Sequence, residues 1–101
     1  MKLKLLKKSD TSAELFLEGR LDTNAAPATQ DAFMQVAEKY SEIVINFTDL
    51  VFISSAGLRA ILVLQKYANR TGIDITYTNL KPSVREVFEL TGFSGILNIE
   101  D

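Results

Sequence analysis

The chain has 101 residues, of which 47% are apolar and 24% are charged, and its 13 acidic and 11 basic side chains leave a formal net charge of -2. This length and composition predict a single domain over residues 1–101 with one hydrophobic core. The near balance of charge argues against nucleic acid as a partner, because binding to nucleic acid depends on phosphate neutralisation by Lys and Arg. The chain has no cysteine and no histidine, so it lacks the usual zinc ligands, thiol nucleophiles and imidazole bases. We therefore expect no metal site, no cofactor and no enzymatic activity.

The N-terminal segment, MKLKLLKKSD, is basic and contains only a short, interrupted apolar stretch. It does not have the pattern of a secretory signal, and nothing in the chain approaches the roughly 20 apolar residues that cross a bilayer. We expect a cytoplasmic protein with no direct membrane contact. The stretch KLKLLKK predicts a first strand near a sheet edge, where lysines discourage pairing with another sheet, so we also expect a monomer.

A second strand and a first helix are predicted next. The stretch AELFLEG places three apolar residues on one face of a half-buried strand, which Gly19 ends. The following helix is indicated by apolar residues at helical spacing: Phe33, Val36, Ala37 and Tyr40. Pro27 is tolerated in its first turn. Three polar residues in front of it could cap the helix: Asp22, Thr23 or Asn24.

The stretch EIVINF is short, β-branched and almost continuously apolar, which is typical of a central strand covered on both faces. A second helix follows from Gly57 over LRAILVLQKYANR, and Gly72 is expected to close it as a left-handed cap. One stripe of this helix is expected to be exposed: Arg59, Lys66 and Arg70.

The C-terminal third adds a strand, IDITYT, and a third helix, in KPSVREVFELTG. Pro82 opens this helix, a capping box is predicted between Ser83 and Glu86, and Gly92 ends it. The last segment, GILNIE, predicts a strand or a half turn of helix. This order of elements predicts an α/β domain, with a mixed, mostly parallel sheet of four to five strands and helices packed on it. In such sheets, sites form where strand carboxyl ends meet helix amino ends, and two loops have this position: GRLDTN and VFISSAG.

The second of these loops leads into a helix whose first turn holds no acidic residue. A helix amino end carries unpaired N–H groups and a partial positive charge, so this turn suits an added anion such as a phosphoryl group on serine. On local grounds a simpler interpretation is favoured, in which Ser54 or Ser55 only caps the helix and Gly57 permits close packing. The lack of a G-x-S-x-G pattern and of histidine excludes a serine hydrolase, and no P-loop motif is present.

Three segments, in this order, resemble the STAS domain of bacterial anti-sigma factor antagonists: LFLEGRLDTNAAP, IVINFTDLVFISSAGLRAIL and KPSVREVFELTGF. The resemblance covers essentially the whole chain and implies a single STAS domain. The phosphoacceptor motif of that family reads D-S-[ST]-G-L, and its first serine is modified by a partner that is both anti-sigma factor and serine kinase. Aligned on Gly57 and Leu58, the resemblance assigns Ser55 as the phosphoacceptor, with Ser54 in place of the aspartate and Ala56 in place of the second hydroxyl.

The resemblance also implies a partner surface around Ser55. Asp22 matches the aspartate of a G-x-L-D loop beside the phosphoacceptor, although it could equally be a helix cap. Leu58 and Arg59 match first-turn positions that face the kinase, although Leu58 could be a core residue and Arg59 a solvated charge. The expected partner-binding residues are Asp22, Thr23 and Asn24 in the first loop, and Ser54, Ala56, Gly57, Leu58 and Arg59 in the second.

The function that the resemblance implies is partner switching. The unphosphorylated protein binds an anti-sigma factor/serine kinase and so releases a sigma factor, and phosphorylation on Ser55 abolishes this binding. The partner carries the ATP, and a serine phosphatase could reset the site. Two alternatives remain open: a STAS subunit that docks on a transport ATPase of the lipid-transport type, and a domain that senses a nucleotide or small ligand between the Asp22 and Ser55 loops.

Overall fold

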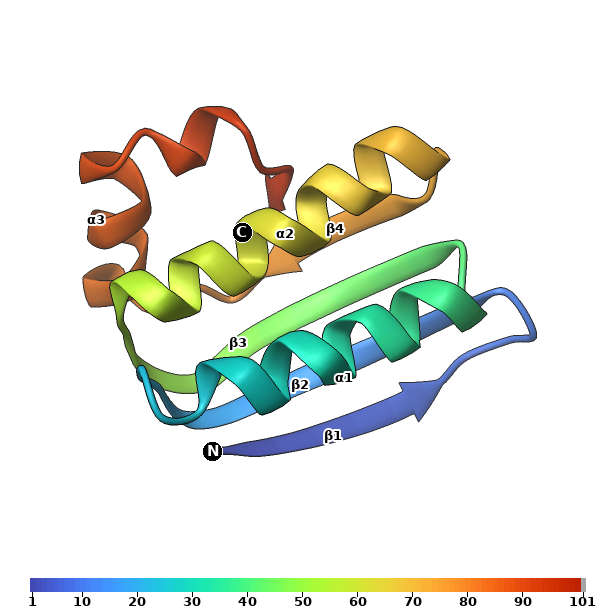
Figure 1. The fold of residues 1–101 in the computed structure, drawn as a ribbon, viewed down its shortest axis with the longest axis horizontal. Coiled ribbons are helices and arrows are strands. Elements are labelled where there is room, and N and C mark those ends of the chain that lie inside the picture. Colours follow the sequence, from blue (N-terminus) through green and yellow to red (C-terminus); the bar gives the residue numbers. More distant parts are fainter. Residues whose placement is uncertain (101) are drawn as a thin grey trace.

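The computed structural model describes residues 1–100, so Asp101, the last residue of the expected domain, lies outside the described residues. The elements, in chain order, are β1 (Lys2–Lys7), β2 (Ser12–Leu21), α1 (Ala26–Lys39), β3 (Glu42–Ile53), α2 (Ser55–Thr71), β4 (Asp74–Thr78), α3 (Pro82–Leu90), the 3-10 turn η1 (Phe93–Gly95) and β5 (Ile99–Glu100). The strands form one five-stranded sheet in the order β1-β2-β3-β4-β5, in which β1 and β2 are antiparallel and all other neighbours are parallel. This confirms the predicted α/β class and the mixed, mostly parallel sheet (Figure 1).

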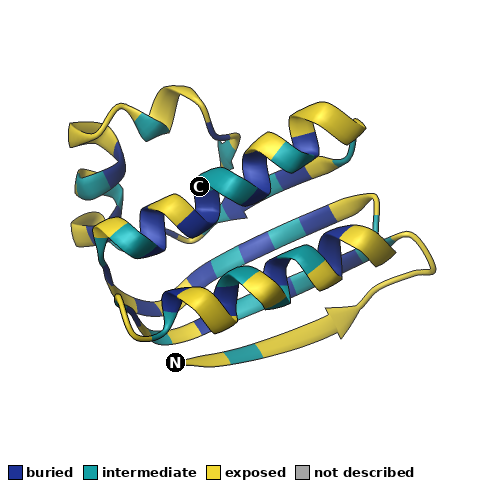
Figure 2. Ribbon diagram, in the orientation of Figure 1, coloured by how far each residue is buried: buried dark blue, intermediate teal, exposed yellow. Residues whose placement is uncertain are grey.

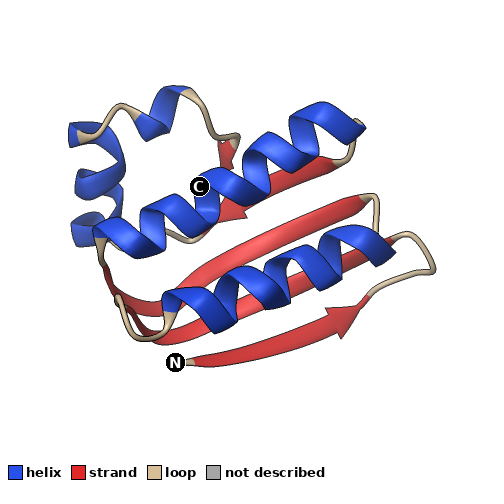
Figure 3. Ribbon diagram, in the orientation of Figure 1, coloured by secondary structure: helices blue, strands red, loops and turns tan. Residues whose placement is uncertain are grey.

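The helices pack on one face of the sheet. In Figures 1 and 3, α1 lies in front of β2, α2 lies in front of β4 with β3 between the two helices, and α3 lies beyond the end of β4. The core between the two layers includes Ile43, Ile45 and Phe47, which are buried on the helix side of β3. The ring of Phe47 packs edge to face against that of Phe88 in α3, with 5.9 Å between centroids, so α3 reaches the same face. Within residues 1–100, no helix combines the length and apolar character needed to span a membrane.

The opposite face of the sheet is open, and the prediction that EIVINF is covered on both faces is wrong. Val44 and Asn46 are only half-buried there, whereas their neighbours on the helix side are buried. On this open face Asn46 Nδ2 donates a hydrogen bond to Glu14 Oε2 (2.9 Å), and Lys8 Nζ lies 3.0 Å from the other carboxylate oxygen. The hydrogen bond from Asn46 lowers the pKa of Glu14, and Lys8 acts in the same direction. A short apolar run cannot reveal that all the helices lie on one side.

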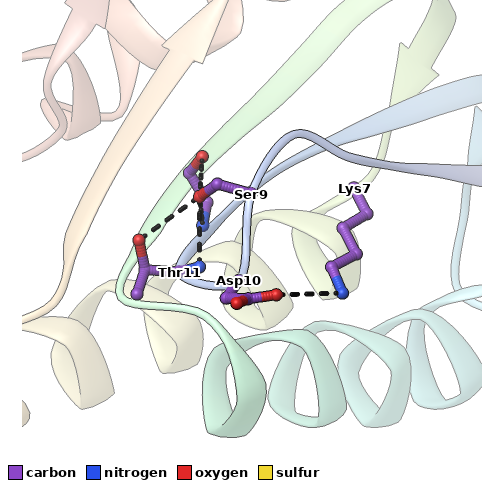
Figure 4. A network of polar contacts seen from close by, with 5 residues as sticks. Lys7, Ser9, Asp10 and Thr11 are labelled. Carbon is purple, nitrogen blue, oxygen red and sulfur yellow. Dashed lines mark hydrogen bonds and ion pairs between the residues drawn. The ribbon is translucent and has the colours of Figure 1, made fainter.

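β1 is an edge strand, as predicted, and Figure 2 shows it exposed along nearly its whole length. The turn from β1 to β2 is held by local polar contacts, some of which are drawn in Figure 4. The hydroxyl of Ser9 accepts hydrogen bonds from the backbone N–H groups of Thr11 (3.1 Å) and Ser12 (3.0 Å). An ion pair between Lys7 and Asp10 (3.4 Å) spans the same turn. These contacts fix the hairpin that carries the lysine-rich edge.

The ends of three elements differ in how well the sequence predicted them. β2 continues past Gly19 to Leu21, so the prediction that this glycine ends the strand is wrong. Gly19 has a φ of +103° and lies at an irregularity in the pairing of β2 with β3, and the strand continues beyond it. The predicted capping box of α3 is also wrong, because Pro82 occupies the start of the helix after the N-cap Lys81 and leaves Ser83 inside the first turn. α2 ends as predicted, with Gly72 in the left-handed region.

A chain of polar side chains connects α2 to β4 within the core. The hydroxyl of the fully buried Tyr77 donates a hydrogen bond to Gln65 Oε1 (3.0 Å), and Gln65 Nε2 donates to Asn69 Oδ1 (2.9 Å). Burial raises the pKa of Tyr77, so its hydroxyl stays protonated and remains a donor. This link fixes the position of α2 along β4.

Replacing Tyr77 with Phe is expected to lower the free energy of unfolding by about 1 to 2 kcal/mol, because Gln65 Oε1 loses its donor in a buried place. Urea denaturation followed by circular dichroism measures the change. Tyr40→Phe is the matched control, because no hydrogen bond of the Tyr40 hydroxyl is found among the described residues, and it should shift stability by less than about 0.5 kcal/mol. A Tyr77→Phe variant as stable as the wild type would contradict the assigned role.

Candidate functional site

The two predicted loops meet at the carboxyl ends of β2 and β3. Leu21, the last residue of β2, is in register with Ile53, the last residue of β3. The backbone N–H of Ser54 donates a hydrogen bond to the carbonyl oxygen of Leu21 (2.9 Å), which ties the start of the second loop to the start of the first. α1 and α2 both begin at this edge of the sheet, as Figure 1 shows. The Asp22 loop and the serine loop therefore form one site, as the parallel topology predicts.

Ser54 is the residue that caps α2. Its backbone is extended (φ -94°, ψ 174°), and its side-chain oxygen accepts a hydrogen bond from the backbone N–H of Gly57 (3.2 Å). Its carbonyl oxygen accepts the first intrahelical bond, from the N–H of Leu58 (2.9 Å). These are the features of an N-cap. The capping interpretation, which the sequence left open between two serines, therefore applies to Ser54.

Ser55 is the first residue of α2 and is exposed. Within residues 1–100, no hydrogen bond to its hydroxyl is found, and the first turn of α2 contains no acidic residue. The helix is 17 residues long, so its amino end carries a full share of the helix dipole. A hydroxyl with no structural task thus lies where a negative charge is stabilised.

Gly57 allows α2 to approach β2 more closely than any other residue could. A Cβ atom built on Gly57 would lie 2.7 Å from the carbonyl oxygen of Leu21, 2.7 Å from the Leu21 Cγ and 2.9 Å from the Ile53 Cγ1. The carbonyl oxygen is backbone and belongs to the strand end that also receives the Ser54 N–H, so it cannot move independently. This contact explains a glycine that would otherwise weaken a first helical turn.

Asp22 holds the turn that precedes α1. Its carboxylate Oδ1 accepts a hydrogen bond from the backbone N–H of Ala25 (2.9 Å), and its carbonyl oxygen accepts one from Ala26 (3.0 Å). The N-cap of α1 is Ala25, and no side chain caps the helix, so the prediction that Asp22, Thr23 or Asn24 caps it is wrong. The side chain of Asp22 shapes the loop, and only its backbone carbonyl oxygen accepts the N–H of Ala26, the first residue of α1.

A hollow of about 380 Å³ lies between the first turns of α1 and α2. Thr23 from the first loop and Ala56 and Arg59 from the start of α2 line it, so the structure brings these three predicted residues together. Asn24 is exposed but is not among the lining residues. The wall on α1 includes polar side chains that the sequence analysis did not select: Gln30 and Asp31. Gln30 and Asp31 lie one turn into a helix that starts at the same edge of the sheet as α2. This position was the only signal in the sequence that could have indicated them.

Leu58 corrects one part of the predicted partner surface. Its side chain is 6% exposed and belongs to the core cluster, because the first turn of α2 directs it toward the sheet. It is therefore not available to a partner. Arg59, the next residue, is exposed, as are Lys66 and Arg70, which confirms the predicted charged stripe. No group of three or more acidic side chains that could hold a metal ion occurs within residues 1–100.

The family model for the STAS domain matches residues 4–101. The chain belongs to the STAS domain family. This is the family that the three sequence motifs indicated, and the five-stranded mixed sheet with three α-helices is its fold.

Curated relatives of this STAS domain are named as anti-sigma factor antagonists, which are regulatory proteins. BtrV of Bordetella bronchiseptica, named for this role, is 36% identical over 76 residues, which cover 75% of this chain and 66%, just under two thirds, of BtrV. The anti-sigma-B factor antagonist of Bacillus subtilis is 22% identical over 94 residues, which cover 93% of this chain and 86% of that protein.

Solved structures agree on the fold. The anti-sigma factor antagonist SpoIIAA in its unphosphorylated form superposes with a TM-score of 0.82 at 20% identity, over 99% of this chain and 89% of the other. The phosphorylated form of SpoIIAA from Bacillus gives a TM-score of 0.76, also at 20% identity, over 99% of this chain and 92% of the other. At this level of identity the likeness concerns the fold of the STAS domain.

The different tasks of the two serines in this STAS domain can be measured. Ser54→Ala is expected to lower the free energy of unfolding by about 1 kcal/mol, because the Gly57 N–H loses its acceptor. Ser55→Ala should change it by less than about 0.5 kcal/mol, because the hydroxyl supports nothing in the fold. Urea denaturation of the two variants gives the comparison, and the reverse order would mean that Ser55 caps α2 in solution.

Gly57→Ala is expected to lower the free energy of unfolding by about 1 to 3 kcal/mol through overpacking against Leu21. The loss would occur although alanine favours a helix over glycine by up to about 1 kcal/mol. Gly95→Ala is the matched control, because a Cβ there meets no atom within 4 Å. Thermal or urea unfolding of both variants measures the effect, and equal stabilities would count against the close approach of α2 to β2.

Proposed function

We propose that the chain is an anti-sigma factor antagonist, built as a single STAS domain over residues 1–101 and acting in the cytoplasm. In its unphosphorylated form it binds an anti-sigma factor that is also a serine kinase, and the sigma factor is thereby released. Phosphorylation on Ser55 ends the binding. The names of the relatives support the role, and the existence of SpoIIAA in unphosphorylated and phosphorylated forms supports a phosphorylation switch on this fold.

The observation that carries this proposal is the division of tasks between the two serines. Ser54 accepts the Gly57 N–H and caps α2, whereas Ser55 is exposed and its hydroxyl has no hydrogen bond within residues 1–100. A kinase can modify Ser55 without removing a contact that the fold needs. The acid-free first turn of α2 leaves the resulting phosphate without a competing carboxylate on its own helix.

Phosphorylation would act on binding through charge and bulk. A phosphoryl group adds about -1.5 to -2 charges at pH 7 and three acceptor oxygens to the centre of the surface formed by the two loops. A partner that covers this surface would have to bury an unpaired charge, which is costly in an interface. The affinity falls while the STAS fold is retained, because Ser55 contributes nothing to the core.

The chemistry of phosphoryl transfer belongs to the partner in this proposal. The chain has no P-loop and no histidine, and its role is that of the substrate. The partner brings ATP and its magnesium ion, and a separate serine phosphatase returns Ser55 to the free hydroxyl. Thr23, Asn24, Ala56 and Arg59 are exposed or line the hollow between the first turns of α1 and α2, so they are the side chains through which the partner is expected to bind.

Two substitutions at Ser55 test the switch. Ser55→Ala is expected to bind the anti-sigma factor/serine kinase with the affinity of the wild type and to accept no phosphate. Ser55→Asp is expected to raise the Kd by about tenfold or more, because a carboxylate is buried without a partner. Calorimetry with the purified partner measures binding, and intact mass after incubation with the partner and ATP measures phosphorylation.

Ser54→Ala is the control for the choice of serine. It should still accept one phosphate, at a peptide that contains Ser55. Phosphate on Ser55→Ala but not on Ser54→Ala would move the acceptor by one residue. Co-purification with a membrane ATPase, with no phosphate on protein isolated from its own cells, would overturn the proposal in favour of a docking subunit.

A further inference from the structure

Two large apolar side chains are exposed at the end of β3, directly before the serine loop. Val51 is 53% exposed and Phe52 is 37% exposed, although both belong to a strand whose other apolar residues are buried or half-buried. Burying side chains of this kind stabilises a fold, so leaving two of them in solvent calls for a reason. Single exposed apolar residues are normal, but two adjacent ones beside a regulated site point to a contact surface.

The exposure results from the way β3 pairs with β2. Arg20 of β2 is in register with Phe52, and Gly19 is in register with Leu50, so Val51 has no counterpart in β2. This is a β-bulge, and Gly19 has a φ of +103° opposite it. The bulge breaks the alternation of the strand, so that Leu50 and Ile53 point into the core while both residues between them point outward. Bulges commonly redirect side chains next to functional sites.

Arg20 completes this surface. Its guanidinium carbon lies 4.1 Å from the centroid of the Phe52 ring, a cation–π contact that holds the arginine over the aromatic side chain. Within residues 1–100, no carboxylate forms an ion pair with Arg20. A guanidinium held in this way keeps its fork of N–H donors free for a carboxylate of another molecule.

We propose that Val51, Phe52 and Arg20, here called the strand-end patch, form part of the surface that binds the anti-sigma factor. Val51 and Phe52 enter an apolar depression of that partner, and Arg20 pairs with a carboxylate at its rim. This inference rests on the proposed function, because it adds residues to the surface around Ser55. The same partner is expected to cover the patch, because the patch is continuous with the site around Ser55 along both β2 and β3.

The continuity follows from the backbone. Arg20 is followed by Leu21 and then by the Asp22 loop, and Phe52 is followed by Ile53 and then by Ser54. An interface of ordinary size covers about 800 Å² on each partner, so it can include both loops and the strand ends that lead into them. Aromatic residues and arginine are enriched in the parts of interfaces that carry affinity. The patch would supply apolar contact area, which the small and polar residues around Ser55 lack.

The test measures binding of the purified anti-sigma factor/serine kinase to variants of the full chain. Val51→Ser, Phe52→Ser and Arg20→Gln are each expected to raise the Kd of the unphosphorylated protein by about fivefold or more. Leu90→Ser is the matched control, because Leu90 is 79% exposed at the end of α3 and is not part of the patch. It should leave the Kd within about twofold of the wild type. Circular dichroism and urea denaturation check that each variant is folded.

Hydrogen exchange on the wild-type complex gives a readout that does not depend on variants. The amides of residues 50–53 should exchange more slowly in the complex than in the free protein, together with those around Ser55. The strand-end patch is overturned if residues 50–53 show no protection and the three patch variants bind as the wild type does. In that case the switch at Ser55 still stands, provided that the partner binds the wild type and that Ser55→Asp weakens the binding. If the partner does not bind the wild type at all, or binds Ser55→Asp equally well, the proposed function itself fails.

Discussion

The contact between Gly57 and the end of β2 is the constraint on which the rest of the site depends. The carbonyl oxygen of Leu21 receives the backbone N–H of Ser54 at 2.9 Å and would lie 2.7 Å from any Cβ at position 57. The end of β2 is therefore hydrogen-bonded to the N-cap residue of α2 and also packs directly against the first turn of that helix. This geometry brings two segments that are some 30 residues apart in sequence to one edge of the sheet. Without it, the loop that follows β2 and the helix that follows β3 would have no fixed relation.

The same constraint explains why the two serines differ. Because the backbone of Ser54 is held in an extended conformation by Leu21, its side chain is directed back over the helix amino end and caps it. Ser55 is then the first helical residue, where the side chain points away from the body of the domain. The bulge in β3 acts on the same strand end from the other side: it places Ile53 in the core, where the close approach of α2 needs it, and leaves Val51 and Phe52 in solvent. The close packing of α2 on this edge of the sheet and the exposure of Val51 and Phe52 thus have a common origin.

The elements and the motif could be predicted from sequence because they rest on local signals. Apolar spacing indicated α1, length and composition indicated α2, and Gly72 indicated the end of α2. The order of strands and helices indicated a mostly parallel sheet. The misses share a different cause. The open face of β3 depends on where every helix packs, the continuation of β2 past Gly19 depends on its pairing with β3, and the burial of Leu58 depends on the rotation of α2. None of these is encoded within one segment, and neither is the hollow between α1 and α2 that Gln30 and Asp31 help to line.

The replacement of an aspartate by Ser54, which departs from the motif of the family, has a direct electrostatic consequence. An aspartate and a serine can both cap a helix, since each offers an oxygen to the N–H of the first turn. An aspartate would add a full negative charge next to position 55, and a phosphoryl group there would meet repulsion as well as the favourable helix dipole. With a neutral cap, a phosphoryl group on Ser55 would meet the amino end of α2 without that repulsion, and Arg59 one turn later is the nearest cation on the same helix. The first turn of α2 is therefore better suited to hold a phosphoryl group than the same turn with an aspartate cap, while the hydrogen bond that closes the helix is unchanged.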